Sequence, residues 1–419
     1  MAQSRRLDHH EEYPLTRMLF QIFSEWTGYS PAWGMLTGIH PVKLFRSHAE
    51  ELGEAQAEKR FLEDYFVAPE KIALLKEISA VQHPFLTQRQ GREICLYIGI
   101  PFCPTKCAYC SFVSQSIEKT KKLIQPFFEG LCLELERTAQ VIAQLGLSVI
   151  SVYVGGGTPT SLSAQQLEIL CQRIHQLFDL SACREFTLEA GRPDTMTADK
   201  LAVLKAGGVT RISINPQSLS DRVLARIGRA HTGEDVRLAF ARSKKAGFSS
   251  INSDLIVGLP EDDLSGFRRS LLGVMEMGAT NITVHALALK RASAITGTGD
   301  FGSHQDAETA NAMMDFADQT LRDRGFVPYY LYRQNRMTGN LENTGWCKPG
   351  DLCQYNIYTM DDSVSVIACG GGGVTKLKSP VDQRLVRLFN FKYPHEYIAR
   401  HEEILQRKDG VIQFYEQFS

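Results

Sequence analysis

The sequence lacks any segment that is long and apolar enough to cross a membrane. Its 419 residues contain no uninterrupted apolar run of the roughly 18–20 residues that a transmembrane helix needs. The beginning, MAQSRRLDHHEEYPL, includes two arginines but no apolar segment behind them, so a secretory leader is not indicated. We therefore expect a cytoplasmic protein without a membrane partner.

The sequence also lacks an excess of charge of either sign. Lys and Arg number 46 and Asp and Glu number 47, which gives a formal net charge of −1. This balance provides no overall field that favours nucleic acid, so no nucleic-acid partner is expected. An anionic substrate must instead be bound by local Arg or Lys. Because a cytoplasmic compartment is reducing, the ten cysteines are expected to be thiols or metal ligands rather than disulfides.

A fourth nearby cysteine is missing from the densest cysteine cluster. The segment YIGIPFCPTKCAYCSF (97–112) contains Cys103, Cys107 and Cys110, and the nearest other cysteine, Cys95, lies upstream in an expected strand. Four thiolates are typical of structural zinc, whereas three thiolates leave one iron of a [4Fe–4S] cube open. An adenosylmethionine can chelate that iron through its amino and carboxylate groups and be cleaved by one electron. A zinc site completed by a distant cysteine stays open as an alternative.

The rest of the chain shows a regular alternation of strands and helices. Residues 1–90 have apolar residues at helical spacing and predict a helical N-terminal region. Six β-rich runs follow, each before an amphipathic helix, which predicts parallel βα units. Six units indicate a barrel or partial barrel with its chemistry at the carboxyl ends of the strands, and a doubly wound open sheet is the alternative. The strand candidates are 94–99, 149–155, 185–190, 210–215, 251–258 and 281–287.

Four motifs together resemble one family. The stretches YIGIPFCPTKCAYCSF, YVGGGTPT, NPQSLSDRVLARIGRAHT and SDLIVGLP are similar to the radical SAM superfamily, specifically the oxygen-independent coproporphyrinogen III oxidase/dehydrogenase family. WGMLTGIHPVKL and LENTGWCKPGDLCQYNIYTM are features of its HemZ-type branch. The resemblance covers roughly residues 92 to 376. Chains of that branch usually have a longer N-terminal region, so this one is expected to begin short.

The resemblance implies the architecture and the cofactors. It implies an α/β fold, a radical SAM partial (β/α)6 TIM-like barrel with a helical N-terminal region and a small α+β C-terminal domain. The expected divisions are 1–90, 91–300 for the barrel and 301–419 for a domain that covers the substrate. The cofactors are a [4Fe–4S] cluster on Cys103, Cys107 and Cys110 and one S-adenosyl-L-methionine; binding of a second adenosylmethionine is left open.

Further residues are assigned to the cofactor site. The glycine-rich turn YVGGGTPT ends the second strand, where backbone without Cβ atoms can approach a ligand closely. By resemblance, Arg229 pairs with the methionine carboxylate, Asp254 meets the ribose hydroxyls and Ala286 offers its backbone to the adenine. From chemistry alone, Arg229 and Asp254 are equally well explained as structural residues. The expected cofactor-binding residues are Tyr97 (also catalytic), Gly156, Gly157, Thr158, Glu189, Gln217, Arg229, Asp254 and Ala286.

The substrate side departs from the family at one position. Characterised coproporphyrinogen enzymes have a histidine where Gly99 stands, and a glycine there is expected to leave space but no hydrogen-bond donor. Propionate anchors are expected at Arg333, Arg336 and Lys348. A flat apolar pocket is expected at Tyr329, Tyr330 and Tyr332.

The expected function is oxygen-independent oxidative decarboxylation of coproporphyrinogen III to protoporphyrinogen IX in haem biosynthesis, by adenosyl-radical chemistry. This enzyme would be a monomer and take electrons from a donor such as flavodoxin or ferredoxin. A haem carrier of the same family is one alternative, although CQYNIYTM keeps only Asn356 of that branch's His-Asn-x-x-Tyr-Trp motif. Two further alternatives are a radical methyltransferase or haem-opening enzyme that acts on a tetrapyrrole, and a barrel protein stabilised by zinc.

Overall fold

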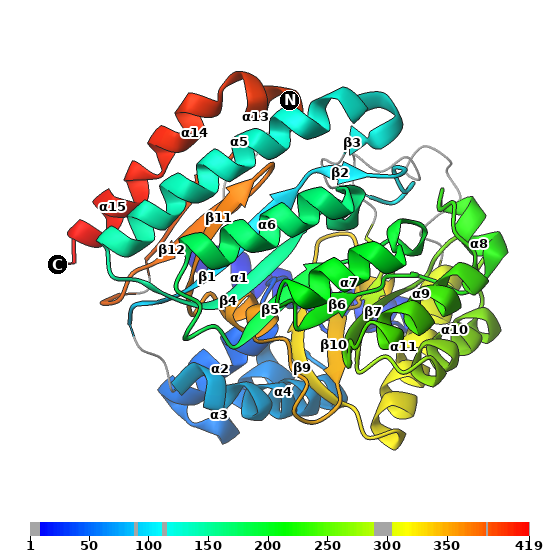
Figure 1. Ribbon diagram of the computed structural model, residues 1–419. Coiled ribbons are helices and arrows are strands. Elements are labelled where there is room, and N and C mark those ends of the chain that lie inside the picture. The colour runs from blue at the N-terminus through cyan, green and yellow to red at the C-terminus, as the bar shows by residue number, and fades with distance from the viewer. Residues whose placement is uncertain (1–8, 88–90, 111–114, 289–303, 383, 419) are drawn as a thin grey trace, which may run out of the picture.

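A single eleven-stranded sheet organises the molecule. The computed structural model describes residues 9–87, 91–110, 115–288, 304–382 and 384–418. The strand order is β13-β12-β11-β1-β4-β5-β6-β7-β8-β10-β9 (Figure 1). Its centre is β1 (Glu93–Ile100), β4 (Ser148–Gly156), β5 (Glu185–Glu189), β6 (Arg211–Ser213), β7 (Ser250–Val257) and β8 (Asn281–Ala286).

These six central strands are parallel and form the predicted partial barrel. Every neighbouring pair from β1 to β8 is parallel. The helices that follow the strands cover the outside of the curved sheet (Figure 1). They are α5 (Ile117–Gln144), α6 (Ala164–Leu177), α7 (Ala198–Ala206), α8 (Asp221–Arg226), α9 (Gly233–Lys245) and α10 (Leu264–Glu276). The expected (β/α)6 architecture is confirmed, and all six strand candidates are strands.

Local sequence explains where several of these helices begin. Ser163 and Gln166 form a reciprocal capping box before α6, and Thr232 and Asp235 form one before α9. Asp263 accepts a hydrogen bond from the backbone of Gly266 at the start of α10. These side chains satisfy backbone N–H groups that have no partner within the helix.

The C-terminal part extends both edges of the barrel sheet. Its helix α11 (His304–Asp323) leads into β9 (Val327–Tyr332) and β10 (Asn343–Cys347), and β10 pairs antiparallel with β8. After α12 (Gln354–Asp361), β11 (Ser365–Gly370) pairs parallel with β1 on the opposite side. The boundary expected at residue 300 lies outside the described residues, and the domain division stays a prediction. The remaining elements are β12 (Val374–Lys378), β13 (Leu385–Phe389), α13 (Pro394–Ala399), α14 (His401–Arg407) and α15 (Asp409–Glu416).

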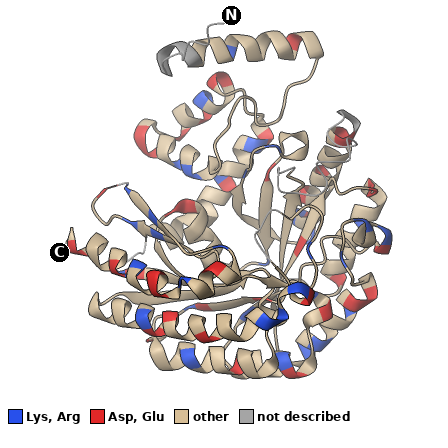
Figure 2. Ribbon diagram, turned by 90° about the horizontal axis from the view of Figure 1, so that it is seen from above, with Lys and Arg blue, Asp and Glu red and all other residues tan. Residues whose placement is uncertain are grey.

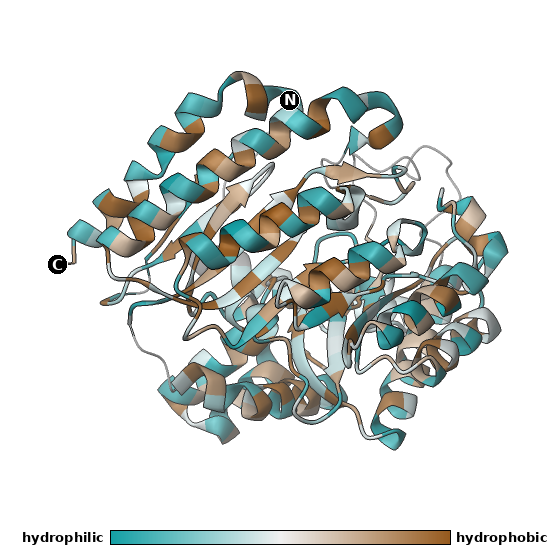
Figure 3. Cartoon of the chain, in the orientation of Figure 1, coloured by the Kyte–Doolittle hydropathy of each residue, from teal (hydrophilic) through white to brown (hydrophobic). Residues whose placement is uncertain are grey.

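The N-terminal region is helical, as predicted, and has its own core. Trp33, Phe45 and Phe61 are among the buried residues of this core, which also reaches Leu331 of β9. In Figure 3 the helices of this region carry both hydrophobic and hydrophilic residues, and the first helix leaves several large apolar side chains exposed. The helices are α1 (His9–Thr27), α2 (Pro41–Leu52), α3 (Glu54–Lys59) and α4 (Pro69–Thr87). Short segments complete the fold: the π-helical Arg60–Asp64, the 3-10 segments Pro159–Ser161, Pro193–Thr195 and Thr338–Asn340, and the two-residue strands β2 (Phe102–Cys103) and β3 (Gln115–Ser116).

The surface shows no element suited to a membrane span within the described ranges. No described helix has the length and apolar character required to cross a bilayer. Acidic and basic residues are interspersed along the outer helices (Figure 2).

Candidate active site

The cysteine loop leaves the carboxyl end of β1, at the mouth of the barrel. Cys103 lies in β2, and Cys107 and Cys110 belong to a turn in which the Cys110 N–H donates to the Cys107 carbonyl at 3.1 Å. All three thiols are partly exposed. The Thr158 hydroxyl donates to Cys103 Sγ at 3.4 Å, and Arg192 Nη1 lies 4.0 Å from Cys107 Sγ. Among the described side chains, no group of three His, Cys, Asp or Glu residues is arranged to hold a single metal ion.

The glycine-rich turn after β4 packs against the start of this loop. The Gly157 N–H donates to the Ile100 carbonyl at 2.8 Å, and the Thr158 N–H donates to the Phe102 carbonyl at 2.7 Å. A Cβ atom on Gly157 would stand 2.5 Å from the Phe102 oxygen. Gly156 has a φ of +103°, in the region that favours glycine. These glycines therefore allow close contact between two backbones beside the cluster loop.

Glu189 ends β5 inside the same mouth. Its carboxylate accepts a hydrogen bond from the Tyr153 hydroxyl at 2.6 Å. Burial, with the nearby charge of Asp254, raises the pKa of Glu189 from 4.5 to about 7, against the lowering effect of Tyr153 and the Gly156 N–H. Tyr97, the predicted catalytic residue, stacks on Tyr153 with ring centroids 6.2 Å apart. The structure thus brings Tyr97, Glu189 and the glycine-rich turn together.

Gln217 and Arg229 contribute buried polar atoms that have no hydrogen-bond partner. Gln217 has a φ of +71°, which is uncommon for a residue with a side chain, and its Oε1 is buried and unpartnered. Arg229 Nη1 donates to the Asn215 carbonyl at 2.6 Å and Nη2 donates to the Tyr109 hydroxyl at 3.1 Å, while Nε is unpartnered. Orphaned buried groups of this kind are costly unless a ligand satisfies them.

Asp254 faces a histidine that the sequence analysis did not single out. His285 Nε2 lies 3.7 Å from Asp254 Oδ2, and the Tyr332 hydroxyl lies 3.4 Å from His285 Nδ1. Hydrogen bonds and charge from His285, aided by Asn252, lower the pKa of Asp254 although burial acts in the opposite direction. Ala286, the next residue, donates its N–H to Asn343 Oδ1 at 3.1 Å.

The expectation that Gly99 leaves free space is wrong. A Cβ atom at this position would stand 2.8 Å from the Gly371 carbonyl oxygen and 3.3 Å from the Tyr97 ring. Gly99 pairs with Gly370 of β11, and the turn after that strand fills the space beside it. A larger residue would therefore require this turn to move.

Two of the charged residues expected to anchor the substrate are engaged in contacts within the fold. Arg333 is 4% exposed, donates to the carbonyls of Leu36 and Asn340, and lies over the Trp33 ring. Burial lowers the pKa of Arg333 to about 10. Lys348 donates to the Arg324 carbonyl and lies beside the first residue of β8, at the opposite end of the barrel from the cysteine loop.

Tyr330, the other expected substrate residue, lies inside the barrel. Its hydroxyl is 2.9 Å from Thr283 Oγ1, and its ring is nearly parallel to that of Tyr332, with an interplanar angle of 5°. The tyrosines expected to form a flat surface are thus close together, but Tyr330 itself is buried.

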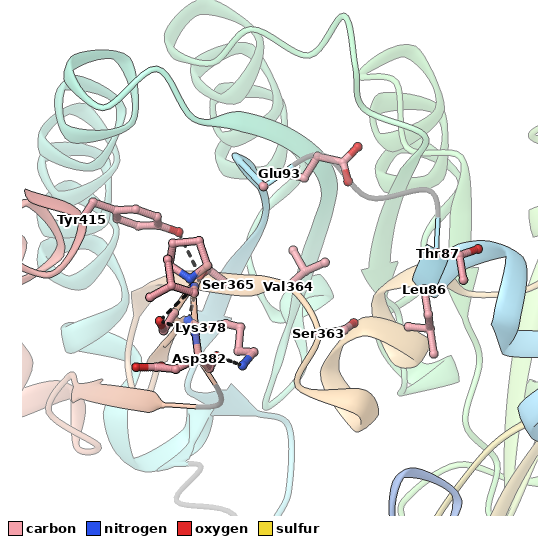
Figure 4. A pocket seen from close by; sticks show the side chains of 13 residues that line it. Leu86, Thr87, Glu93, Ser363, Val364, Ser365, Lys378, Asp382 and Tyr415 are labelled. Atoms are coloured by element: carbon pink, nitrogen blue, oxygen red, sulfur yellow. Dashed lines mark hydrogen bonds between the residues drawn. The ribbon is translucent and has the colours of Figure 1, made fainter. Parts of the chain in front are cut away.

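Helix α12 begins at the amino end of the barrel, where the Gln354 and Tyr355 N–H groups donate to the carboxylate of Glu185, the first residue of β5. Helix α12 places Tyr355 against Tyr153, with ring centroids 4.3 Å apart. A separate cavity of about 400 Å³ lies between the first residues of β1 and β11 and the residues near Tyr415 (Figure 4). Since Glu93 and Ser365 begin these parallel strands, this cavity lies at the far end from the cysteine loop and is not the cofactor site.

Comparisons with known proteins agree with this arrangement. The Radical SAM superfamily model matches residues 97–271. The chain is 38% identical over 386 residues to the oxygen-independent coproporphyrinogen-III oxidase-like protein HemZ of Bacillus subtilis (strain 168), covering 91% of this chain and 77% of that protein. It is 29% identical over 309 residues to the heme chaperone HemW of Escherichia coli (strain K12), covering 72% of this chain and 75% of HemW. The solved structure of coproporphyrinogen III oxidase (HemN) from Escherichia coli has the same fold, with a TM-score of 0.60, 21% identity and coverage of 78% of this chain and 72% of that one.

The chain is similar throughout the barrel to proteins of the radical SAM class. It belongs to the oxygen-independent coproporphyrinogen III oxidase family of that superfamily, in the branch that contains HemZ. Proteins of this superfamily use a [4Fe–4S] cluster and S-adenosylmethionine. The residues at the mouth fit these groups: three partly exposed thiols, two buried guanidinium groups beside Cys107, and the unpartnered Gln217 Oε1 and Arg229 Nε.

Proposed function

We propose that the protein decarboxylates two propionate side chains of coproporphyrinogen III to vinyl groups without oxygen. A hydrogen atom is removed from each propionate, carbon dioxide leaves, and an acceptor takes the remaining electron. When bound, the [4Fe–4S] cluster and adenosylmethionine would supply the hydrogen-abstracting chemistry. The cluster would be held by Cys103, Cys107 and Cys110. The adenosylmethionine would be oriented by the side chains of Tyr97, Glu189, Gln217, Arg229 and Asp254 and by the turn at Gly156, Gly157 and Thr158. Its adenine would lie near Ala286.

The observation that supports this proposal is a cluster of stacked tyrosine rings beside the cofactor residues. The rings of Tyr97, Tyr153 and Tyr355 are nearly parallel, with interplanar angles of 16° to 21°. The Tyr153 hydroxyl donates a hydrogen bond to Glu189, so this cluster adjoins the proposed cofactor site. Aromatic side chains suit contact with a flat macrocycle, and the name of the HemZ relative points to the same substrate class.

A haem carrier is the second candidate because several relatives are named heme chaperone HemW. That branch's haem-ligating histidine corresponds to Tyr355 here. Tyr355 is 9% exposed and packed against Tyr97 and Tyr153, and burial raises its pKa well above the ordinary value. A phenolate ligand at this position would have to leave the barrel interior, which favours the enzyme.

The test is an anaerobic turnover experiment. The chain with a reconstituted cluster is supplied with a reductant, adenosylmethionine and coproporphyrinogen III, and tetrapyrrole products and 5′-deoxyadenosine are measured by mass spectrometry. We expect a product that has lost two carboxyl groups, abolished by Cys103→Ala but retained by the matched control Cys132→Ala, whose thiol lies on α5. Formation of 5′-deoxyadenosine with unchanged or methylated tetrapyrrole would overturn the substrate assignment.

A haem titration separates the second candidate. If the chain is a carrier that uses Tyr355, haem should bind stoichiometrically and Tyr355→Phe should change its absorption spectrum. The proposed enzyme predicts that this variant leaves any haem spectrum unchanged. Iron and sulfide analysis of the same preparations tests the alternative of a zinc-stabilised barrel, because near-equal amounts of iron and sulfide would exclude it.

A further inference from the structure

Arg192 is a buried cation at the mouth that the sequence analysis did not identify. It follows the last residue of β5, Glu189, in the segment EAGRPD. Only 3% of its surface is exposed. Burial of a guanidinium group is unfavourable unless anions and hydrogen-bond acceptors surround it. The groups that contact Arg192 therefore indicate the role of its positive charge.

Most contacts of Arg192 are with the cluster loop. Nη1 donates to the Thr105 carbonyl at 3.3 Å, and Nη2 donates to the Thr105 hydroxyl at 3.0 Å. Nη1 also lies 4.0 Å from Cys107 Sγ, and Nε donates to Asp194 Oδ1 at 3.2 Å. Thr105 in turn donates to the Gly228 carbonyl at 3.0 Å. One guanidinium group thus ties the loop to the end of β5 and faces a cluster thiol.

The positive charges of the two arginines beside Cys107, Arg192 and Arg229, are not fully balanced by the carboxylates that contact these arginines. Arg229, the second buried cation beside Cys107, bonds to two backbone carbonyls and the Tyr109 hydroxyl, all of them neutral. His231 is also buried here, and burial with the nearby arginines lowers its pKa to about 4, so it is neutral near pH 7. Asp194 is the carboxylate that contacts Arg192. An anionic group on the loop would balance the remaining positive charge.

We propose that Arg192 is a positioning residue that fixes the cluster loop through Thr105 and raises the reduction potential of the cluster by its charge beside Cys107. Hydrogen bonds to the sulfur ligands and local net charge are principal determinants of iron–sulfur potentials. A positive charge stabilises the more negative, reduced state and makes it easier to reach. The proposal concerns the cluster and does not depend on the tetrapyrrole substrate.

The test measures the cluster itself, in the full chain without substrate. Iron and sulfide per chain are determined first, and the midpoint potential is then followed by electron paramagnetic resonance in a redox titration. We expect Arg192→Gln to shift the midpoint potential to a more negative value, while Arg192→Lys, which keeps the charge, restores most of the wild-type value. Arg173→Gln, which removes an exposed arginine on α6 that pairs with Glu136, is the matched control and should cause no shift.

A second variant keeps the proposal testable if Arg192→Gln does not take up a cluster. Asp194→Asn removes the carboxylate that partly neutralises Arg192, so we expect a midpoint shift in the opposite, positive direction. Thr105→Val removes the hydroxyl that accepts from Arg192 and donates to the Gly228 carbonyl but leaves the charge of Arg192, and should change the potential less than either variant. Equal potentials in wild type, Arg192→Gln and Asp194→Asn would overturn the proposal, as would a Thr105→Val shift as large as that of Arg192→Gln.

Discussion

Two glycine runs lie on either side of the strand that leads into the cysteine loop. Gly155–Gly157 ends β4, Gly370–Gly373 follows β11, and both of these strands pair with β1. Both runs approach the end of β1 closely, since Cβ atoms at Gly157 and Gly370 would overlap the carbonyl oxygens of Phe102 and Gly99. Both are runs of three or more glycines at the end of a strand beside β1.

The two runs differ in what their polar contacts serve. In the first run Gly156 donates to Glu189, and Thr158 contacts Cys103, so the turn is connected to the cofactor residues. In the second run, the four backbone N–H groups donate to Glu134, Gly99, Phe391 and Gly370 respectively. A glycine-rich sequence therefore indicates close backbone approach, and only the neighbouring groups decide whether that approach serves a ligand.

A buried ion pair holds the second run in place. Glu134 Oε1 lies 2.7 Å from Lys408 Nζ, and the Glu134 carboxylate also accepts hydrogen bonds from Gly370, Asn390 and Tyr397. Replacement Glu134→Leu leaves Lys408 buried without its anion, so we expect a loss of about 3–5 kcal/mol in the free energy of unfolding. Urea denaturation measures this loss. The control is Glu136→Gln, which lies on the same helix as Glu134 but pairs with Arg173 of α6 at a partly exposed site. A loss below about 1 kcal/mol would contradict this account of the network.

The glycines of the second run separate steric overlap from backbone strain. Gly370 has a φ of +85° and no room for a side chain, whereas Gly372 has a φ of +70° and a Cβ atom added there would have no neighbour within 4 Å. We expect Gly370→Ala to cost about 2–3 kcal/mol and Gly372→Ala about 1 kcal/mol. Thermal and urea unfolding check both values. Equal losses would mean that strain alone, rather than the contact with Gly99, explains the glycine at 370.

Glu189, beside the first glycine run, makes the stability of the folded protein depend on pH. Its pKa is raised to about 7 in the folded protein from 4.5, so its contribution to stability is fullest below pH 4.5 and is lost as the pH rises through 7. Glu189→Gln cannot ionise, and we expect it to gain about 2 kcal/mol relative to wild type between about pH 5 and pH 8. Urea unfolding at both pH values measures this difference. If Glu189→Gln instead lost unfolding free energy relative to wild type over this pH range, the carboxylate would be ionised and stabilised in the folded protein.

The smallest expected effect concerns the contact between the first run and the cluster loop. Thr158→Val removes the hydroxyl that donates to Cys103 Sγ and keeps the shape of the side chain. We expect a change in unfolding free energy of about 1 kcal/mol or less, together with faster loss of iron from the reconstituted chain. Thr160→Val, whose hydroxyl contacts Thr195 instead of a cysteine, is the control for iron release. Equal release rates in both variants would exclude a role for the Cys103 contact.

Much of the fold and the centre of the site could be predicted from local pattern. The six strand candidates are strands, because β-rich runs between amphipathic helices carry their own periodicity. The cysteine loop could be assigned because three thiols at this spacing have few other uses, and Glu189 and the glycine-rich turn lie beside it at the strand ends. The contacts of Arg333 and Lys348 could not be predicted, because the sequence around a charged residue does not show which distant carbonyl groups it will bond to.

The sequence by itself determined the barrel, its helical cover, the cysteine loop and the end of the barrel at which that loop lies. Only the tertiary structure decided the surroundings: that Gly371 fills the space beside Gly99, that Arg192 faces Cys107, and that β11 rather than a separate sheet borders β1. The physical reason is that strand and helix periodicity is a property of neighbouring residues. Steric exclusion and charge compensation, in contrast, depend on groups that are distant in the sequence and meet only after folding.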